Sequence, residues 1–347
     1  MSRVHRFTVL VCFNIFIIFF LFNHSKITCF FSKYGTEVEN LKNSSIPNVQ
    51  VLSNESFDTT IFADVEFPII SQYVLNPTDL CSRGIKNEVK LSLLILVISA
   101  VPNIIQRVTI RETWGSIASA SNNTGPIRLG FLLGSTTSEE LQQRVRAEAT
   151  HFGDIIQQDF MDTYRNLTLK SIMLLKWAKE FCPNVQYVLK TDDDMYINVP
   201  NLIDFLIKTP TKSNIMYGYL FRKAKPNRNP SHKWFVPKSQ FAADMFPDYL
   251  SGTGYVMSRD VVPKLLESVY VVQFFLMEDI FITGFCAGES RISRHHVKSF
   301  SYWRRPATGC AFKDAISGHH VTTHDMIKIW KELNKRNLVC HKKKKNS

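Results

Sequence analysis

Two kinds of pattern are missing from this sequence of 347 residues. It contains no Cys-x-x-Cys pair and no His-rich spacing, the arrangements that hold zinc in small metal-binding domains. It also contains no repeat of fixed period, which argues against a repeat protein. Hydrophobic residues make up 45% of the chain and charged residues 21%, a composition that predicts a mostly globular protein.

Acidic residues are fewer than basic ones, and the formal net charge is +12. Such a charge suggests a nucleic-acid-binding protein. However, residues 328–347 contain eight Lys or Arg against one Glu, a net charge of +7 in one short segment. We therefore interpret residues 336–347 as a solvated basic tail and expect no nucleic-acid partner.

The N-terminus carries an apolar run, Phe7–Phe22, which follows Arg3, His5 and Arg6. No A-x-A-like cleavage site follows it, so the run is typical of an uncleaved signal anchor. The positive-inside rule then predicts a cytosolic tail at 1–6, a transmembrane segment at 7–22 and the rest in a lumen. We expect a single-pass type II Golgi membrane protein; a cleaved signal and a secreted enzyme are the alternative.

Residues 23–75 are polar and lack a sustained period, which predicts a stem between this anchor and a catalytic domain at 76–335. In a luminal protein the Asn-x-Ser/Thr sequons become candidate glycosylation sites. These candidates are Asn43, Asn54, Asn122 and Asn166.

The cysteines are interpreted as disulfide partners because a luminal compartment is oxidising. The candidates are Cys81, Cys182, Cys286 and Cys310, and the number of possible pairings leaves their connectivity open. One expected pair is Cys286–Cys310, because these residues flank a basic, loop-like segment.

Apolar runs alternate with helical patterns along the middle of the chain. Strands are predicted at 91–98, 127–134, 154–160 and 185–190, and helices at 102–115, 138–153, 167–182 and from Pro200. Ser138 is the predicted N-cap of the second helix. This alternation predicts an α/β fold with a mostly parallel sheet covered by helices on both faces.

The stretch YVLKTDDDMYINVP places Asp192, Asp193 and Asp194 directly after the fourth predicted strand. Ligands of such sheets bind beyond the carboxyl ends of the strands. A carboxylate cluster there suits a hard divalent cation that bridges two phosphate oxygens of a nucleotide. Asp192 and Asp194 are the candidate metal ligands, with Asp193 turned elsewhere; an acidic turn that caps the next helix is the alternative.

Five motifs, in order and at these separations, carry a resemblance to a known family. They are RVTIRETWG, DFMDTYRNLTLKS, KTDDDMYINV, YLSGTGYVMS and EDIFITG. From about Asn76 to Leu333 the chain closely resembles the luminal beta-1,3-glycosyltransferases, the galactosyltransferase family related to Fringe. The resemblance implies a GT-A type Rossmann-like fold, a UDP-sugar donor, manganese (Mn2+) and inversion at the anomeric carbon.

The resemblance also assigns expected roles to individual residues. Asp194 is the first choice as metal ligand, His319 matches a histidine that completes the metal shell, and His320 is the second choice for that position. The nearby THDM differs from the Pro-x-Glu-Met of many relatives, so the local loop is expected to differ. The expected donor-binding residues are Arg107, Arg111, Lys170, Asp192 and Asp193.

Transfer to a hydroxyl group requires a base near the acceptor. The resemblance assigns this role to Asp279, with the adjacent Glu278 as the alternative. Trp234 and Tyr249 are candidates to stack on an acceptor sugar, and Gly252 and Gly254 to allow close backbone approach. Core packing is the alternative for both aromatic residues.

Taken together, the sequence predicts an inverting UDP-sugar-dependent hexosyltransferase that forms a beta-1,3 linkage to a glycan on a glycoprotein or glycolipid. Galactose is the expected sugar, with N-acetylglucosamine and N-acetylgalactosamine as alternatives. Two other classes are an inactive sugar-binding relative and a metal-dependent nuclease. An inactive relative would be expected to lose Asp279 or an outer aspartate of the triplet, and all of them are present.

Overall fold

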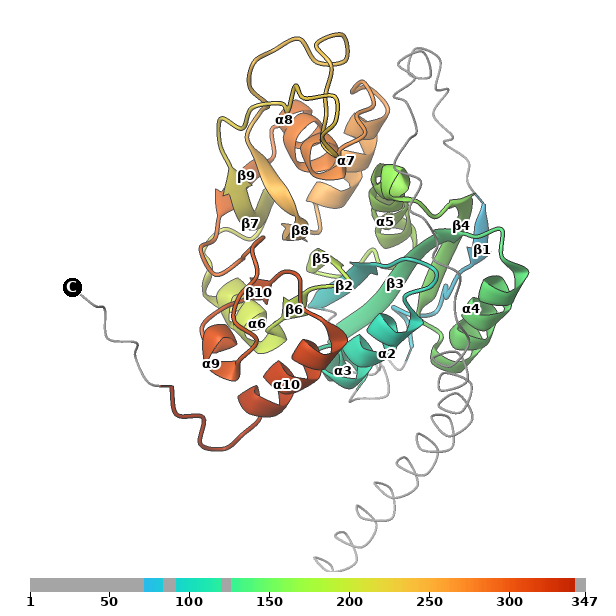
Figure 1. The fold of residues 1–347 in the computed structure, drawn as a ribbon, viewed down its shortest axis with the longest axis vertical. Coiled ribbons are helices and arrows are strands. Elements are labelled where there is room, and N and C mark those ends of the chain that lie inside the picture. Colours follow the sequence, from blue (N-terminus) through green and yellow to red (C-terminus); the bar gives the residue numbers. More distant parts are fainter. Residues whose placement is uncertain (1–71, 84–91, 120–125, 341–347) are drawn as a thin grey trace, which may run out of the picture. The chain divides into compact units, whose positions relative to one another are not determined.

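The computed structural model describes residues 72–83, 92–119 and 126–340, all of which belong to the unit Val65–Ser347 (Figure 1). The predicted cytosolic tail, the predicted anchor at 7–22 and most of the predicted stem lie outside these residues. Within the described ranges, no helix combines the length and the apolar composition that crossing a membrane requires. For the residues that the structure describes, this finding contradicts the predicted location as a single-pass Golgi membrane protein.

A mixed eight-stranded sheet forms the centre of the unit, in the order β1-β4-β3-β2-β5-β8-β7-β9 (Figure 1). Strands β4, β3, β2 and β5 are parallel, whereas β8 is antiparallel to both β5 and β7. The bounds are Tyr73–Leu75 (β1), Leu93–Ile98 (β2), Ile127–Ser135 (β3), Ile155–Met161 (β4), Tyr187–Asp192 (β5), Ile215–Phe221 (β7), Tyr249–Ser258 (β8) and Ser293–His296 (β9). A separate pair joins β6 (Tyr196–Ile197) to β10 (Ser317–Gly318).

The predicted α/β fold with a mostly parallel sheet is confirmed. The runs that predicted the first four central strands form β2, β3, β4 and β5, and all six residues of β2 are buried. Continuous apolar sequence is expected of parallel strands with both faces covered. The predicted cap is also present, because the Ser138 side chain accepts a hydrogen bond from the Leu141 amide.

Helices cover both faces of the sheet (Figure 1). Helices α5 and α7, with the π-helix η3, bury apolar residues on one face, and α2, α6 and α10 do so on the other. The bounds are Ile104–Glu112 (α2), Ser116–Ser119 (α3), Glu139–Phe152 (α4), Tyr164–Asn166 (η2, a 3-10 turn), Leu167–Phe181 (α5), Val199–Lys208 (α6), Val261–Val269 (α7), Ile280–Cys286 (η3), Ala287–Glu289 (α8), Gly309–Phe312 (α9) and Thr323–Leu333 (α10).

Three strands meet where the aspartate triplet begins. Ile98, the last residue of β2, is in register with Asp192, the last residue of β5. Antiparallel β8 places Gly254 opposite Thr191. The loop after β2, the triplet after β5 and the glycine-rich start of β8 therefore lie at the same edge of the sheet.

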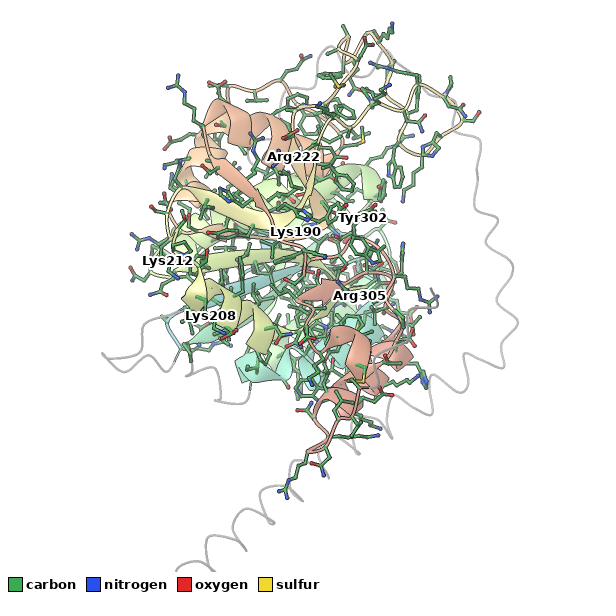
Figure 2. All side chains as sticks on the ribbon, turned by 90° about the vertical axis from the view of Figure 1, so that its left-hand side faces the viewer. Lys190, Lys208, Lys212, Arg222, Tyr302 and Arg305 are labelled. Carbon is green, nitrogen blue, oxygen red and sulfur yellow. A yellow bond between two sulfur atoms is a disulfide. The ribbon has the colours of Figure 1, made fainter. Side chains whose placement is uncertain are left out.

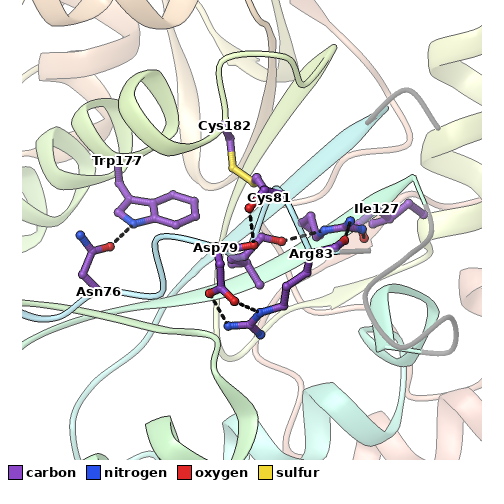
Figure 3. The surroundings of a disulfide bond; sticks show 10 residues. Asn76, Asp79, Cys81, Arg83, Ile127, Trp177 and Cys182 are labelled. Atoms are coloured by element: carbon purple, nitrogen blue, oxygen red, sulfur yellow. Dashed lines mark hydrogen bonds and ion pairs between the residues drawn. A yellow bond between two sulfur atoms is a disulfide. The ribbon is translucent and has the colours of Figure 1, made fainter. Parts of the chain in front are cut away.

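The described residues contain two disulfides, and neither is the expected Cys286–Cys310 pair, so that prediction is wrong. Cys81 binds Cys182 with 5.5 Å between the Cα atoms and joins residues 76–83 to the end of α5 (Figure 3). Cys310 binds Cys340 near the C-terminus. Cys286 is a free, buried cysteine of the core that packs α5, α7 and η3, whereas α9, which carries Cys310, packs on the other face.

Of the four predicted glycosylation sites, Asn43, Asn54 and Asn122 lie outside the described residues. Asn166 precedes α5, and its side-chain amide donates to the Met161 carbonyl oxygen at 2.7 Å. Its glycosylation stays a prediction.

Candidate functional site

The three aspartates at the end of β5 turn toward three different partners. Asp192 accepts a hydrogen bond from the Lys190 ammonium at 2.7 Å. Asp193 accepts from the Ser99 hydroxyl at 2.7 Å and from the Asn103 amide at 2.9 Å, so it holds the loop after β2. Burial raises the pKa of Asp192 to about 6, although Lys190 opposes the shift, and burial also raises the pKa of Asp193.

Asp194 meets two histidines from the far end of the chain. Its Oδ2 lies 3.1 Å from Nε2 of His319 and 3.5 Å from Nδ1 of His320. Nδ1 of His319 lies 2.9 Å from the Tyr302 carbonyl oxygen, which fixes the ring orientation. Burial raises the pKa of Asp194, but the hydrogen bond and charge of His319 outweigh burial and hold it below its usual value.

A short sheet brings these residues together. Tyr196 of β6 pairs with Gly318 of β10, and the Val321 amide donates to the Asp194 carbonyl oxygen at 2.9 Å. His320 has a φ of 55°, a left-handed conformation that non-glycine residues rarely adopt. Such strain persists where surrounding structure imposes it, often at ligand sites.

The cluster of Asp194, His319 and His320 can hold a divalent metal ion. One ligand atom from each residue lies within 4.8 Å of the others, and a carboxylate with two imidazoles is a donor set that suits first-row transition metals. The sequence predicted Asp194 and His319 for this role. It also predicted Asp192 as a metal ligand. In the structure Asp192 binds Lys190 instead, and His320 is the third residue of the cluster.

Asp279 caps the start of η3, and it has fewer hydrogen-bond and charged partners than the adjacent Glu278. Its two oxygens accept hydrogen bonds from backbone amides, that of Ile280 at 2.9 Å and that of Gly252 at 3.3 Å. Burial and the negative charge of Glu278 raise the pKa of Asp279 to about 7. A carboxylate with such a pKa is suited to accept a proton near neutral pH.

Glu278, the alternative base, is buried, and both of its carboxylate oxygens have partners. Its Oε1 accepts from the Ser171 hydroxyl and the Tyr255 hydroxyl, each at 2.8 Å. Its Oε2 lies 3.5 Å from the Lys190 ammonium. This geometry favours Asp279 over Glu278 as the proton acceptor.

Two predicted donor-binding residues, Arg107 and Arg111, are structural in this arrangement. Arg107 is buried, and all three of its guanidinium nitrogens donate to protein acceptors, among them Glu148 at 2.7 Å. Arg111 pairs with Glu148 and with Asp154, each at 2.8 Å. Their guanidinium groups are therefore not available to grip a phosphate directly.

Lys170 is similarly enclosed. Its ammonium donates to Asp162 at 2.7 Å and to the Ser99 carbonyl oxygen, and only 2% of the side chain is exposed. Burial lowers its pKa, against the opposing charge of Asp162. The lysine ties α5 to the loop after β2 that also holds Asp193.

Tyr249 belongs to an aromatic cluster that spans the site. It stacks on Phe221 with 5.2 Å between ring centroids, Phe221 contacts Tyr302 at 4.9 Å, and Tyr302 contacts Trp303 at 5.2 Å. Tyr302 and Trp303 are 39% and 42% exposed. At one end of the cluster, Tyr249 interacts electrostatically with Asp279. At the other end, the Tyr302 carbonyl oxygen contacts the His319 ring.

The other predicted acceptor residues differ in their surroundings. Trp234 is 52% exposed and donates to the Tyr164 hydroxyl at 3.1 Å, with Lys233 over the Tyr164 ring. A Cβ at Gly252 would lie 2.9 Å from Glu278 Oε2, so a larger residue there would have to displace the Glu278 carboxylate. At Gly254 a Cβ would make ordinary contacts, so the predicted close approach does not require glycine.

Comparison with known proteins points to the same family as the sequence motifs. The family model described as Galactosyltransferase matches residues 105–298. The chain is 34% identical over 286 residues to Beta-1,3-galactosyltransferase 2 of Homo sapiens, covering 80% of this chain and 66% of that protein. It is 32% identical over 274 residues to Beta-1,3-galactosyltransferase 1 of Mus musculus, covering 78% of this chain and 81% of that protein. The chain belongs to the galactosyltransferase family.

This galactosyltransferase-family chain spans just under two thirds of the length of the first of these relatives. Among solved structures, the apo WbbM bifunctional glycosyltransferase covers 71% of this chain and 51% of that chain, with 11% identity and a TM-score of 0.39. A glycosyltransferase that acts in glycosylation of the PBCV-1 major capsid covers 69% and 98%, with 12% identity and a TM-score of 0.34. These scores are too low to support an argument from structural likeness.

Sequence reasoning missed Lys190, whose ammonium lies close to both Asp192 and Glu278. The only available signal was a single lysine inside the otherwise apolar strand YVLK. Reasoning from sequence also missed Tyr302 and Trp303, which lie in an irregular segment without a motif of their own.

Proposed function

We propose that this protein transfers galactose from UDP-galactose to an acceptor glycan hydroxyl in a beta-1,3 linkage, with inversion at the anomeric carbon. The observation that carries the proposal is the placement of two functional groups in a galactosyltransferase-family chain. The Asp194, His319 and His320 cluster and the Asp279 carboxylate are both held at the edge where β5 and β8 meet. The names of the relatives support galactose and the beta-1,3 linkage.

The reaction is a single displacement. The acceptor hydroxyl oxygen forms a bond to the anomeric carbon of the donor, and the bond from that carbon to the diphosphate breaks. The hydroxyl proton passes to Asp279, which two backbone amides hold in place. UDP leaves with the electron pair of the broken bond, so no covalent enzyme intermediate forms.

The donor diphosphate is expected near Asp194, His319 and His320, which would hold Mn2+. When bound, such a cation neutralises negative charge on the departing diphosphate. Asp193, held by Ser99 and Asn103, is a further donor-side residue of the proposal. Arg107, Arg111 and Lys170 would act indirectly, because their contacts fix the loops around the donor rather than leave a side chain free.

The acceptor is proposed to lie over the aromatic cluster of Tyr249, Phe221, Tyr302 and Trp303. The apolar face of a pyranose ring packs well on an aromatic ring. The cluster extends from the surroundings of Asp279 to those of His319, so a sugar over it could present a hydroxyl to the base. The acceptor would be a glycan carried by a glycoprotein or a glycolipid.

A donor screen on the full chain with Mn2+ tests the proposal. UDP-galactose, UDP-N-acetylglucosamine and UDP-N-acetylgalactosamine would be compared with a panel of glycan acceptors, and the linkage of the product determined by NMR. We expect transfer from UDP-galactose to a 3-hydroxyl. Transfer from another donor alone would establish one of the alternative activities, and donor binding without transfer would support an inactive sugar-binding relative.

A further inference from the structure

One lysine lies between the two halves of the proposed site. Lys190 is on β5, two residues before Asp192, and its side chain is 4% exposed. Its ammonium binds Asp192 at 2.7 Å, lies 3.5 Å from Glu278 and donates to the Gly252 carbonyl oxygen. Figure 2 shows it inside the fold, whereas Lys208 and Lys212 lie at the periphery.

The backbone of Gly252 links Lys190 to Asp279, the proposed base. Its carbonyl oxygen accepts from Lys190, and its amide donates to Asp279 at 3.3 Å. A Cβ on residue 252 would lie 2.9 Å from Glu278 and 3.2 Å from the Asp279 Cβ. The backbone of Gly252 is therefore packed directly between the lysine and the Asp279 carboxylate.

Glu278 provides a second connection. It precedes Asp279 in the chain, and the hydroxyls of Ser171 and Tyr255 fix one of its oxygens while Lys190 faces the other. Movement of the lysine would thus disturb both groups that flank Asp279. Neither the motifs nor the predicted site residues gave Lys190 a role.

We propose that Lys190 is a positioning residue, which holds Asp279 in place through Gly252 and Glu278 and connects this base to the donor side at Asp192. The proposal rests on the proposed function, because it assigns a role within the transfer reaction. Lys190 touches neither the acceptor nor the donor in this role.

The charges around Asp279 distinguish positioning from simple structural support. Negative Glu278 precedes it, Lys190 approaches from β5, and Tyr249 and Tyr255 of β8 interact with it electrostatically. The charge of Glu278 raises the pKa of Asp279, whereas that of Lys190 lowers it. Removing either charge should therefore move the acid limb of the pH–rate profile, and the two removals should move it in opposite directions.

The test compares Lys190→Met, Lys190→Arg, Glu278→Gln and the double variant K190M/E278Q with the full parent chain. We expect Lys190→Met to lower kcat about 10²-fold, the scale for displacing a reacting group by about 1 Å, with little change in the KM for donor. Its acid limb should move to higher pH, and that of Glu278→Gln to lower pH. Lys190→Arg should recover part of kcat, since it keeps the charge.

The matched control is Lys208→Met, which removes an exposed lysine that pairs with Asp204 on the surface. It should retain parent kcat and the parent pH profile. If Lys190→Met is poorly folded, the double variant carries the test, because it also removes the unpaired glutamate charge; it should fold and still show reduced kcat.

Three results would overturn the proposal. The first is parent kcat in Lys190→Met, and the second is an acid limb that stays at the parent pH in both Lys190→Met and Glu278→Gln. The third is failure of both Lys190→Met and the double variant to fold, which would make Lys190 structural. A parent chain that binds UDP-sugar but never transfers would contradict the proposed function instead, since every comparison is made relative to parent turnover.

Discussion

His319 Nε2 lies 3.1 Å from Asp194 Oδ2, although these two residues are far apart in the sequence. The contact depends on β10, which pairs with β6 and returns the C-terminal segment to the end of β5. The aspartate triplet therefore does not form a metal site alone. One of its members combines with histidines, while the others fasten the neighbouring loop and Lys190.

Metal binding should depend on Asp194 and the two histidines. Asp194→Ala and His319→Ala are expected to abolish the Mn2+ binding that titration calorimetry detects in the presence of UDP, because each removes a ligand from the cluster. His320→Ala should weaken it, and His324→Ala, an exposed neighbour in α10, is the control. Unchanged Mn2+ affinity in all three cluster variants would place the metal elsewhere.

The sequence was sufficient for the central strands, because their apolar runs are continuous and lie between recognisable helices. The same reasoning did not foresee that β8 inserts antiparallel between β5 and β7, since YLSGTGYVMS contains glycines and polar residues that weaken a strand pattern. That insertion is what brings Gly252 beside Asp279. The site could thus be predicted in part, but its internal contacts could not.

The residues whose roles changed all have partners distant in sequence. Arg107 and Arg111 lie in a motif that suggested nucleotide contact, yet they are bound by Glu148 from another helix. Cys310 pairs with Cys340 rather than with Cys286. The helix that carries Cys310 packs on one face of the sheet, and the helix that carries Cys286 packs on the other. Nothing in the local pattern specifies such long-range choices.

The exposed aromatic residues should affect acceptor binding selectively. Tyr302→Ala and Trp303→Ala are expected to raise the KM for acceptor about tenfold, equivalent to roughly 1.4 kcal/mol of lost contact, with smaller changes in the KM for donor. Tyr270→Ala, a similarly exposed tyrosine after α7, is the control. Steady-state kinetics with each substrate varied in turn would check this, and a larger effect on donor than on acceptor would contradict it.

Arg111 should contribute to stability rather than to donor affinity. Arg111→Met removes the ion-pair partner of the buried Asp154, whereas Glu148 keeps its contact with Arg107, and it is expected to cost roughly 3–5 kcal/mol in the free energy of unfolding. Arg144→Met, which breaks an exposed pair with Glu140, should cost about 0.5 kcal/mol or less. Denaturant unfolding measures both. A stable Arg111→Met protein with much weaker UDP-sugar binding would restore the predicted donor role.

The Cys81–Cys182 disulfide should stabilise the fold more than the C-terminal one does. It spans 101 residues, against 30 for Cys310–Cys340, and the loss of a crosslink over a longer loop is expected to cost more, roughly 4–5 against about 3–4 kcal/mol. Thermal unfolding of Cys182→Ser and Cys340→Ser variants compares them. Non-reducing peptide maps of the parent should show Cys286 as a free thiol, and its recovery in a disulfide would contradict the pairing.

The proton acceptor should give transfer a distinct pH dependence. With a pKa of about 7, Asp279 is ionised above that pH and protonated below it, so kcat/KM should fall about tenfold per pH unit on the acid side. Asp279→Asn cannot accept the proton and is expected to lower kcat by roughly 10² to 10⁴. It should also lose this acid limb. Donor affinity, measured at each pH with saturating Mn2+, separates the base from protonation of the histidines. If Asp279→Asn retains both the rate and the acid limb of the parent, the proton is accepted by another group.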